Sequence, residues 1–184
     1  MKGLKRLMLL VLLLAASCAA FLDYMGMFGS VNVTERQVGP FSYAYEEFTG
    51  PYKNTMPVFA RVTDFLNEQG IIPGKSVGVF FDNPSQVPPE KLRSNCGAMI
   101  TETDPIKLSA LQVQLKLGSF EATNCVTAEF PIRNTLSYIL GPMKIYPLLS
   151  KYIKDNGYQM KESYEIYDTQ ANKIVYFIPA SRQQ

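Results

Sequence analysis

Length, composition and charge limit the functions open to this chain. It has 184 residues, no histidine, no tryptophan and a formal net charge of +2. The absence of histidine excludes Ser-His-Asp and Cys-His catalysis within the chain and removes the commonest zinc ligand. The small net charge gives no reason to expect a nucleic-acid partner.

Residues 1–29 are expected to form an N-terminal signal anchor or signal peptide. Three basic residues lie within the first six positions, and an uncharged run over residues 7–22 follows them. That run is short for a membrane-spanning helix and long for the apolar core of a signal peptide. If the segment is retained, we expect it to contact the membrane through residues 4–29.

Three fates of this segment remain open. It is retained as a single membrane anchor, or it is cut after the small residues 15–20 to export a soluble protein, or Cys18 is lipidated as in a bacterial lipoprotein. Basic residues favour the cytoplasmic side of a membrane. Each alternative therefore places the rest of the chain on the non-cytoplasmic side.

The remaining residues, 30–184, are enough for one hydrophobic core and predict a single domain. Its elements follow the order strand, helix, strand, strand twice over. In the first half, we expect extended segments at 31–38 and 41–48, a helix at 57–69, and strands at 76–82 and 95–101. After a short helix within 106–117, we expect a strand at 119–130, a helical region at 135–156 interrupted by Gly141 and Pro142, and strands at 160–168 and 173–179. This order predicts an α+β fold in which duplicated βαββ units form an antiparallel sheet with two main helices packed on it.

The connection between strands 76–82 and 95–101 is rich in turn-forming residues. Asp82 can bond the backbone two residues on, and Pro84 fixes φ and prevents strand pairing. Pro88 and Pro89 make a second stop before Arg93. We expect a structural role for this loop, in which Arg93 bonds its carbonyl groups or pairs with Asp82.

The loop FDNP-x-x-VPPEK-x-R at residues 81–93 resembles the hallmark loop of the GyrI-like small-molecule-binding domain, the effector-binding domain of AraC-type regulators. The likeness is nearest to the membrane-anchored branch that contains a testis-expressed reticulophagy receptor. It implies that residues 30–184 form a GyrI-like domain with a ligand cleft between its two halves.

The same resemblance points to ligand-binding residues. Many GyrI-like domains carry an E-x-Y element whose glutamate points into the cleft, and Glu165 and Tyr167 match it. A carboxylate among tyrosines in an apolar cleft can pair with a cationic ligand or, with a raised pKa, act as a general base. The expected ligand is therefore a small molecule that is lipophilic or cationic. Tyr43, Tyr45 and Phe80 complete the expected set. A solvated strand with exposed charges is the alternative for Glu165, and a surface position is the alternative for Tyr43 and Tyr45.

Three function classes follow. The leading one is a membrane-tethered or exported small-molecule-binding protein, for which we expect no cofactor and no metal. The second is a hydrolase of small reactive molecules with Glu165 and Tyr167 as its catalytic pair. The third is a membrane adaptor; an autophagy role would need a long disordered tail beyond Gln184, and we do not expect it.

Overall fold

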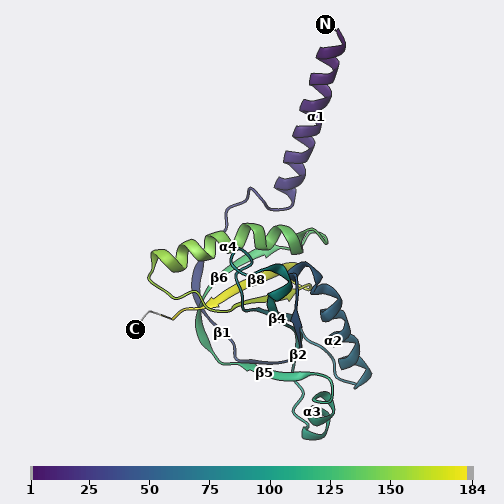
Figure 1. Cartoon of the computed structure of the whole chain (residues 1–184), viewed down its shortest axis with the longest axis vertical. Helices are drawn as coiled ribbons and strands as arrows, with labels where there is room; N and C mark the ends of the chain where they lie inside the picture. The colour runs from purple at the N-terminus through teal and green to yellow at the C-terminus, as the bar shows by residue number, and fades with distance from the viewer. Residues whose placement is uncertain (1, 182–184) are drawn as a thin grey trace.

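The computed structural model describes residues 2–181 and consists of one curled antiparallel sheet with helices (Figure 1). Residues 182–184 of the predicted domain lie outside the described residues. The strands are β1 (Thr34–Val38), β2 (Phe41–Thr49), β3 (Ser76–Phe80), β4 (Arg93–Ile100), β5 (Lys116–Phe120), β6 (Thr123–Pro131), β7 (Ser163–Asp168) and β8 (Lys173–Pro179). The helices are α1 (Lys2–Tyr24), α2 (Met56–Glu68), α3 (Pro105–Leu111) and α4 (Ser137–Asp155), with 3-10 turns η1 (Tyr52–Asn54) and η2 (Pro89–Lys91).

The strand order β1-β6-β8-β7-β3-β4-β2-β5 shows the predicted duplication. The units β2-α2-β3-β4 and β6-α4-β7-β8 occupy equivalent positions on either side of the central β3–β7 pair, where Gly78 lies opposite Glu165. Both main helices end at a glycine with φ +69°, Gly70 and Gly157, a conformation that glycine adopts without steric cost. The α+β fold expected from the sequence is confirmed.

Each unit is completed by a strand from the other. β1 pairs with β6, and β5 pairs with β2, so the two halves exchange their outer strands. The expected single strand at 119–130 is instead two strands, because the chain turns at Glu121, whose carbonyl accepts a hydrogen bond from the Thr123 hydroxyl at 2.9 Å. This extra strand closes the far edge of the sheet.

The helix α4 runs without a break where the sequence predicted an interruption. Pro142 and Pro147 lie inside it and each removes a backbone donor. The helix persists because one side of it packs on β6 and β8 along its whole length. The buried residues of that side include Gly141, Ile145, Leu149 and Ile153.

Helix α2 covers the other half of the same face and packs on β4 and β2. Its buried residues are Val58, Phe59, Val62 and Leu66. The opposite face of the curled sheet holds a separate apolar core, made of Tyr43, Val77, Val79, Phe120, Cys125, Ile166, Val175 and Phe177.

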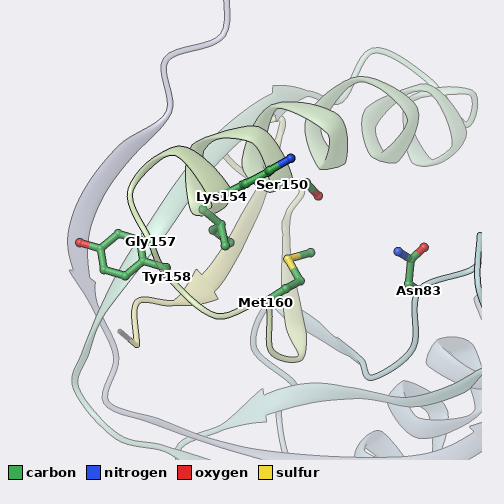
Figure 2. Close-up of a pocket in the computed structure, with 7 residues that line it drawn as sticks. Asn83, Ser150, Lys154, Gly157, Tyr158 and Met160 are labelled. Carbon is green, nitrogen blue, oxygen red and sulfur yellow. The ribbon is translucent and has the colours of Figure 1, made fainter. Parts of the chain in front are cut away.

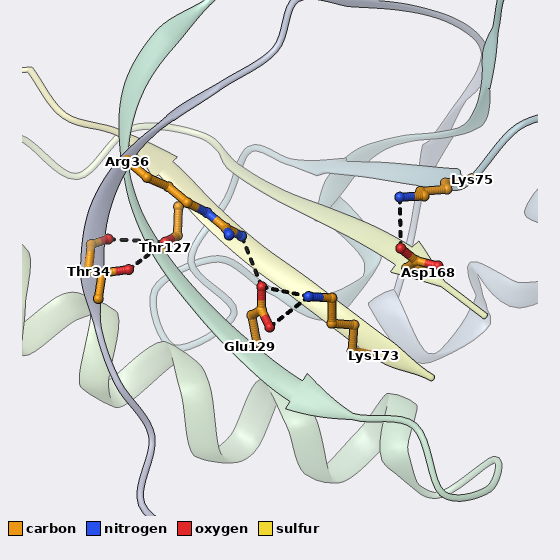
Figure 3. A network of polar contacts seen from close by, with 7 residues as sticks. All are labelled: Thr34, Arg36, Lys75, Thr127, Glu129, Asp168 and Lys173. Carbon is orange, nitrogen blue, oxygen red and sulfur yellow. Dashed lines mark hydrogen bonds and ion pairs between the residues drawn. The ribbon is translucent and has the colours of Figure 1, made fainter. Parts of the chain in front are cut away.

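Ion pairs join neighbouring strands (Figure 3). Glu129 of β6 accepts a hydrogen bond from Arg36 of β1 at 3.0 Å and pairs with Lys173 of β8 at 2.9 Å. Lys75, just before β3, pairs with Asp168 at the end of β7 at 2.7 Å. The two halves are therefore linked by side chains as well as by the β3–β7 ladder.

Helix α1 projects away from the domain (Figure 1). The segment Gly3–Tyr24 is long enough and apolar enough to cross a membrane, and none of its apolar stretch is buried in the protein. A signal sequence has the same properties, so the helix alone does not separate an anchor from a signal peptide.

Candidate functional site

Glu165 lies at the centre of the helix-covered face of the sheet. Strand alternation puts Glu165 and Tyr167 on that face, while Ile166 belongs to the core on the opposite face. The backbone partner of Glu165 on β3 is Gly78, which has no side chain to occupy the space beside the carboxyl group. A Cβ at Gly78 would come within 2.7 Å of the Phe80 ring.

Two tyrosine hydroxyl groups hold the Glu165 carboxyl group. Tyr146 of α4 donates to Oε1 at 2.7 Å, and Tyr167 of β7 donates to Oε2 at 2.7 Å. The Tyr146 hydroxyl is also 3.1 Å from the Ser163 hydroxyl. We call this group, Glu165, Tyr146, Tyr167 and Ser163, the Glu165 site.

Burial dominates the electrostatics of the Glu165 site. Glu165 is only 4% exposed, and this desolvation raises its pKa to about 7, although both tyrosine hydrogen bonds act in the opposite direction. Burial and the neighbouring carboxylate raise the pKa of Tyr146 and of Tyr167 well above the usual value. Both hydroxyl groups thus keep their protons and act as donors at neutral pH.

Aromatic rings from both main helices meet above the site. The ring centroid of Phe59 of α2 is 5.4 Å from that of Tyr167, and the centroid of Tyr138 of α4 is 5.6 Å from it. These three rings and Tyr146 fill the space between the helices at the centre of the domain. The carboxyl group is consequently enclosed by side chains that would have to move before a ligand reached it.

The structure brings together some of the predicted ligand-binding residues and separates others. Glu165 and Tyr167 are in contact, and Phe80 lies on the same face, 7% exposed, with its ring 4.9 Å from that of Tyr52. Tyr43 and Tyr45 lie on the opposite face, with ring centroids 5.3 Å apart. The two faces could not be distinguished before the pairing of β2 was known.

Residues that the sequence did not single out complete the site. Tyr138 and Tyr146 come from α4, eight positions apart, and Phe59 comes from α2. Eight residues make slightly more than two helical turns, so the spacing of the two tyrosines on one side of a helix was visible in the sequence. Which strand they would face was not.

The loop between β3 and β4, which contains Asp82, Asn83 and Pro84 and which we call the DNP loop, is held by an ion pair between Asp82 and Arg93. The Asp82 carboxylate accepts from the backbone N–H of Arg93 at 2.8 Å and from its guanidinium at 2.8 and 3.0 Å. This guanidinium lowers the pKa of Asp82 below its usual value. Pro84 lies in the turn after Asp82, Pro88 precedes η2, and Pro89 is the first residue of η2. The pair closes the loop next to Tyr52, whose hydroxyl is 3.0 Å from the Asp82 carbonyl.

Two surface hollows lie elsewhere on the described part of the chain. One, of about 400 Å³, is bordered by the end of α4 and the DNP loop (Figure 2) and is lined by Asn83, Ser150, Ile153, Lys154, Gly157, Tyr158 and Met160. The other, of about 230 Å³, is lined by Pro40, Phe41, Ser42, Ser119, Phe120 and Glu121. Neither hollow is lined by Glu165.

Known proteins are similar to this chain in sequence or in fold. The chain is 31% identical over 182 residues to human testis-expressed protein 264. The matched region covers 95% of this chain and 56% of that protein. The chain spans about half the length of the curated relatives it matches. Among solved structures it is similar to EcmrR in an EcmrR–DNA complex, with a TM-score of 0.60 and 8% identity over 92% of this chain and 65% of that one.

A second solved structure of similar fold is SAV2435 bound to tetraphenylphosphonium, with a TM-score of 0.51 and 10% identity over 82% of this chain and 94% of that one. At these identities the structures establish the fold alone. A family model for the GyrI-like small-molecule-binding domain matches residues 32–179. The chain therefore belongs to the GyrI-like family.

Proposed function

We propose that this chain is a membrane-tethered small-molecule-binding protein whose ligand contacts the Glu165 site between α2 and α4. The observation that carries the proposal is the buried Glu165 carboxyl group, to which, within the described residues, two tyrosine hydroxyls donate at 2.7 Å and no basic side chain does. A buried carboxylate without a neighbouring cation is costly to ionise. A cationic ligand would supply the missing positive charge.

The surroundings favour a lipophilic cation. Phe59 and Tyr138 pack against the ring of Tyr167, whose hydroxyl bonds the carboxyl group, and aromatic rings attract cations in desolvated sites. Tetraphenylphosphonium, the compound in the SAV2435 structure, combines a positive charge with aromatic surface and is a suitable probe. Its binding requires the rings of α2 and α4 to move apart.

Calorimetric titration of the full chain with tetraphenylphosphonium tests the proposal. Glu165→Gln should weaken binding by about 10- to 150-fold, which corresponds to the 1.5–3 kcal/mol of a hydrogen bond to a charged group. Glu162→Gln is the matched control, because Glu162 contacts Tyr164 on the other face of the sheet. Equal binding by the wild type and Glu165→Gln would refute the role of this carboxylate.

We also propose that α1 is retained as the anchor and that the domain lies on the non-cytoplasmic side. The basic residues Lys5 and Arg6 near the start of α1 support this orientation. Protease digestion of sealed vesicles should leave the domain protected when the cytoplasmic face is outward. Digestion of the domain in those vesicles would reverse the orientation, and a chain that stays in the soluble fraction would refute the anchor.

A hydrolase is the second candidate. A carboxyl group with a pKa of about 7 suits a general base that activates water. The hydrogen bond from Tyr167 would orient the Glu165 carboxyl group for this role. Turnover of a small electrophile that Glu165→Gln abolishes would favour the enzyme. Binding of the cation without any turnover would favour the binding protein.

A further inference from the structure

We propose that the outer side of α4 rests on the surface of the bilayer that α1 crosses, so that the domain lies against the membrane. This inference depends on the membrane tethering proposed above. Figure 1 shows that α4 lies between the end of α1 and the sheet, so that one side of α4 faces the sheet and the other faces α1. That side of α4 is the part of the domain nearest to the proposed membrane.

An apolar stripe covers the first two turns of this outer side. Leu136 is 44% exposed, Ile139 56% and Met143 65%. Their spacing of three and four residues places them on one side of the helix. The buried residues Ile145 and Leu149 point to the sheet, which leaves the stripe of Leu136, Ile139 and Met143 without a partner within the described residues. We call these three residues the outer stripe.

The link between α1 and the domain is fixed by packing. Met25 is fully buried, and a Cβ at Gly26 would come within 2.9 Å of the Pro131 ring. On α4, Lys144 donates to the carbonyl oxygens of Gly26 at 2.6 Å and Gly29 at 2.5 Å. The chain after α1 is therefore held to α4, and α4 cannot move far from the membrane.

Two residues set the depth of α4. Residues Gly3–Tyr24 make a helix of about 33 Å, close to the roughly 30 Å of the bilayer hydrocarbon core, so Tyr24 falls near the headgroups. The Arg133 guanidinium lies 5.5 Å from the Tyr24 ring centroid, three residues before the outer stripe begins. Tyrosine and arginine both suit the interface between lipid and water. The first residue of the outer stripe then lies at the same depth.

The occupant of the outer stripe is accordingly the interfacial layer of the bilayer. Helix α4 has three lysines and one aspartate, a composition that also favours anionic headgroups. On its inner side, the same helix carries Tyr146, which bonds Glu165, and Tyr138, which packs on Tyr167. The proposed contact therefore places the bilayer on the side of α4 opposite to the Glu165 site.

The chain has no tryptophan, so one introduced tryptophan reports on a single position. We suggest Met143→Trp on the outer stripe and Val113→Trp as the control, because Val113 is 81% exposed and follows α3, at the end of the molecule farthest from α1 (Figure 1). Each full-length variant is reconstituted into phosphatidylcholine vesicles, with or without bromine on the lipid acyl chains. Ile139→Trp is the second probe if Met143→Trp does not fold.

The Met143→Trp emission should shift to shorter wavelength in vesicles and fall by about half or more with brominated lipid, as expected for side chains about 5–10 Å within the interface. The Val113→Trp emission should not change. If the chain floats with the vesicles but Met143→Trp and Ile139→Trp behave like the control, the contact between α4 and the membrane is refuted while the tether stands. If the chain does not float with the vesicles, the tether itself is refuted.

Discussion

The Glu165 carboxyl group combines burial with hydrogen bonds from two tyrosines, and these two influences act on its pKa in opposite directions. Burial is the larger, and the pKa rises from 4.5 to about 7. The hydrogen bonds from Tyr146 and Tyr167 fix the position of the group without supplying a positive charge. This arrangement is the basis of our proposal that the ligand of the site is a cation.

This pKa has a consequence for stability. A carboxyl group whose pKa is raised on folding stabilises the fold below its unfolded pKa and loses that contribution as the pH rises. The shift from 4.5 to about 7 corresponds to about 3 kcal/mol of unfolding free energy lost across that interval. Urea unfolding of the wild type and Glu165→Gln should show this loss in the wild type only.

A difference between the two proteins that does not change with pH would contradict the raised pKa. Cation binding should have the opposite dependence and strengthen as the pH rises through about 7, because ionised Glu165 attracts the cation. Stability and cation binding, both measured on the wild type and Glu165→Gln, separate the free-energy cost of burying the carboxylate from its contribution to binding.

Gly141 and Tyr176 form a second sensitive contact. The Tyr176 hydroxyl is buried without a hydrogen-bond partner in the described structure, and a Cβ at Gly141 would collide with it. Gly141→Ala should destabilise the domain by about 1–3 kcal/mol, although alanine is normally the better residue in a helix. Thermal unfolding measures the change.

The hydroxyl itself is responsible, so Tyr176→Phe should restore much of the loss caused by Gly141→Ala. The single variant Tyr176→Phe should be neutral or stabilising, since it removes an unpaired buried group. A double variant as unstable as Gly141→Ala alone would place the strain elsewhere in α4.

Strand alternation and the E-x-Y likeness predicted that Glu165 and Tyr167 share a face, and the structure agrees. The contact with Tyr146 could not be predicted, because it depends on how α4 is rotated over β7. Tyr43 was grouped with Glu165 although it lies on the opposite face, because its face depends on the register of β2 with β4 and β5.

At the scale of elements, the sequence located most helices and strands because their apolar spacing and their glycine ends were clear. Two differences have physical causes. Packing on the sheet carries α4 through Pro142 and Pro147, which single-helix reasoning treats as a break. The turn at Glu121 divides one expected strand into β5 and β6, and only cross-pairing with the other half shows that both are strands.

The DNP loop provides a test at this scale. Arg93→Ala removes the two guanidinium hydrogen bonds to Asp82 and should lower the melting temperature at neutral pH. The backbone N–H bond can survive the substitution, so the loss should come from the guanidinium. Lys91→Ala, in the adjacent turn η2, is the control and should have little effect.

The same pair predicts a dependence on pH. The pKa of Asp82 is lowered in the folded protein, so its contribution is present above the unfolded pKa and is lost as the pH falls through the folded value. The difference in melting temperature between wild type and Arg93→Ala should therefore shrink in acid. A difference that persists in strong acid would mean that Arg93 acts through other contacts.

At the scale of the whole molecule, each half contains a strand that completes the other. β1 lies beside β6 and β5 beside β2, and the central β3–β7 ladder joins the units. At the centre of this arrangement, side chains of both main helices meet, because Phe59 of α2 and Tyr138 of α4 pack on Tyr167 and Tyr146 of α4 bonds Glu165. The Glu165 site is a property of the assembled pair of units.

The most direct test of the Glu165 site is a crystal structure of the domain with tetraphenylphosphonium. We predict that the cation lies between α2 and α4 with its charge beside the Glu165 carboxylate, and that the hydrogen bond from Tyr146 is broken or lengthened to admit it. A cation bound instead in the hollow beside Lys154, with Glu165 still enclosed by both tyrosines, would contradict the proposed site.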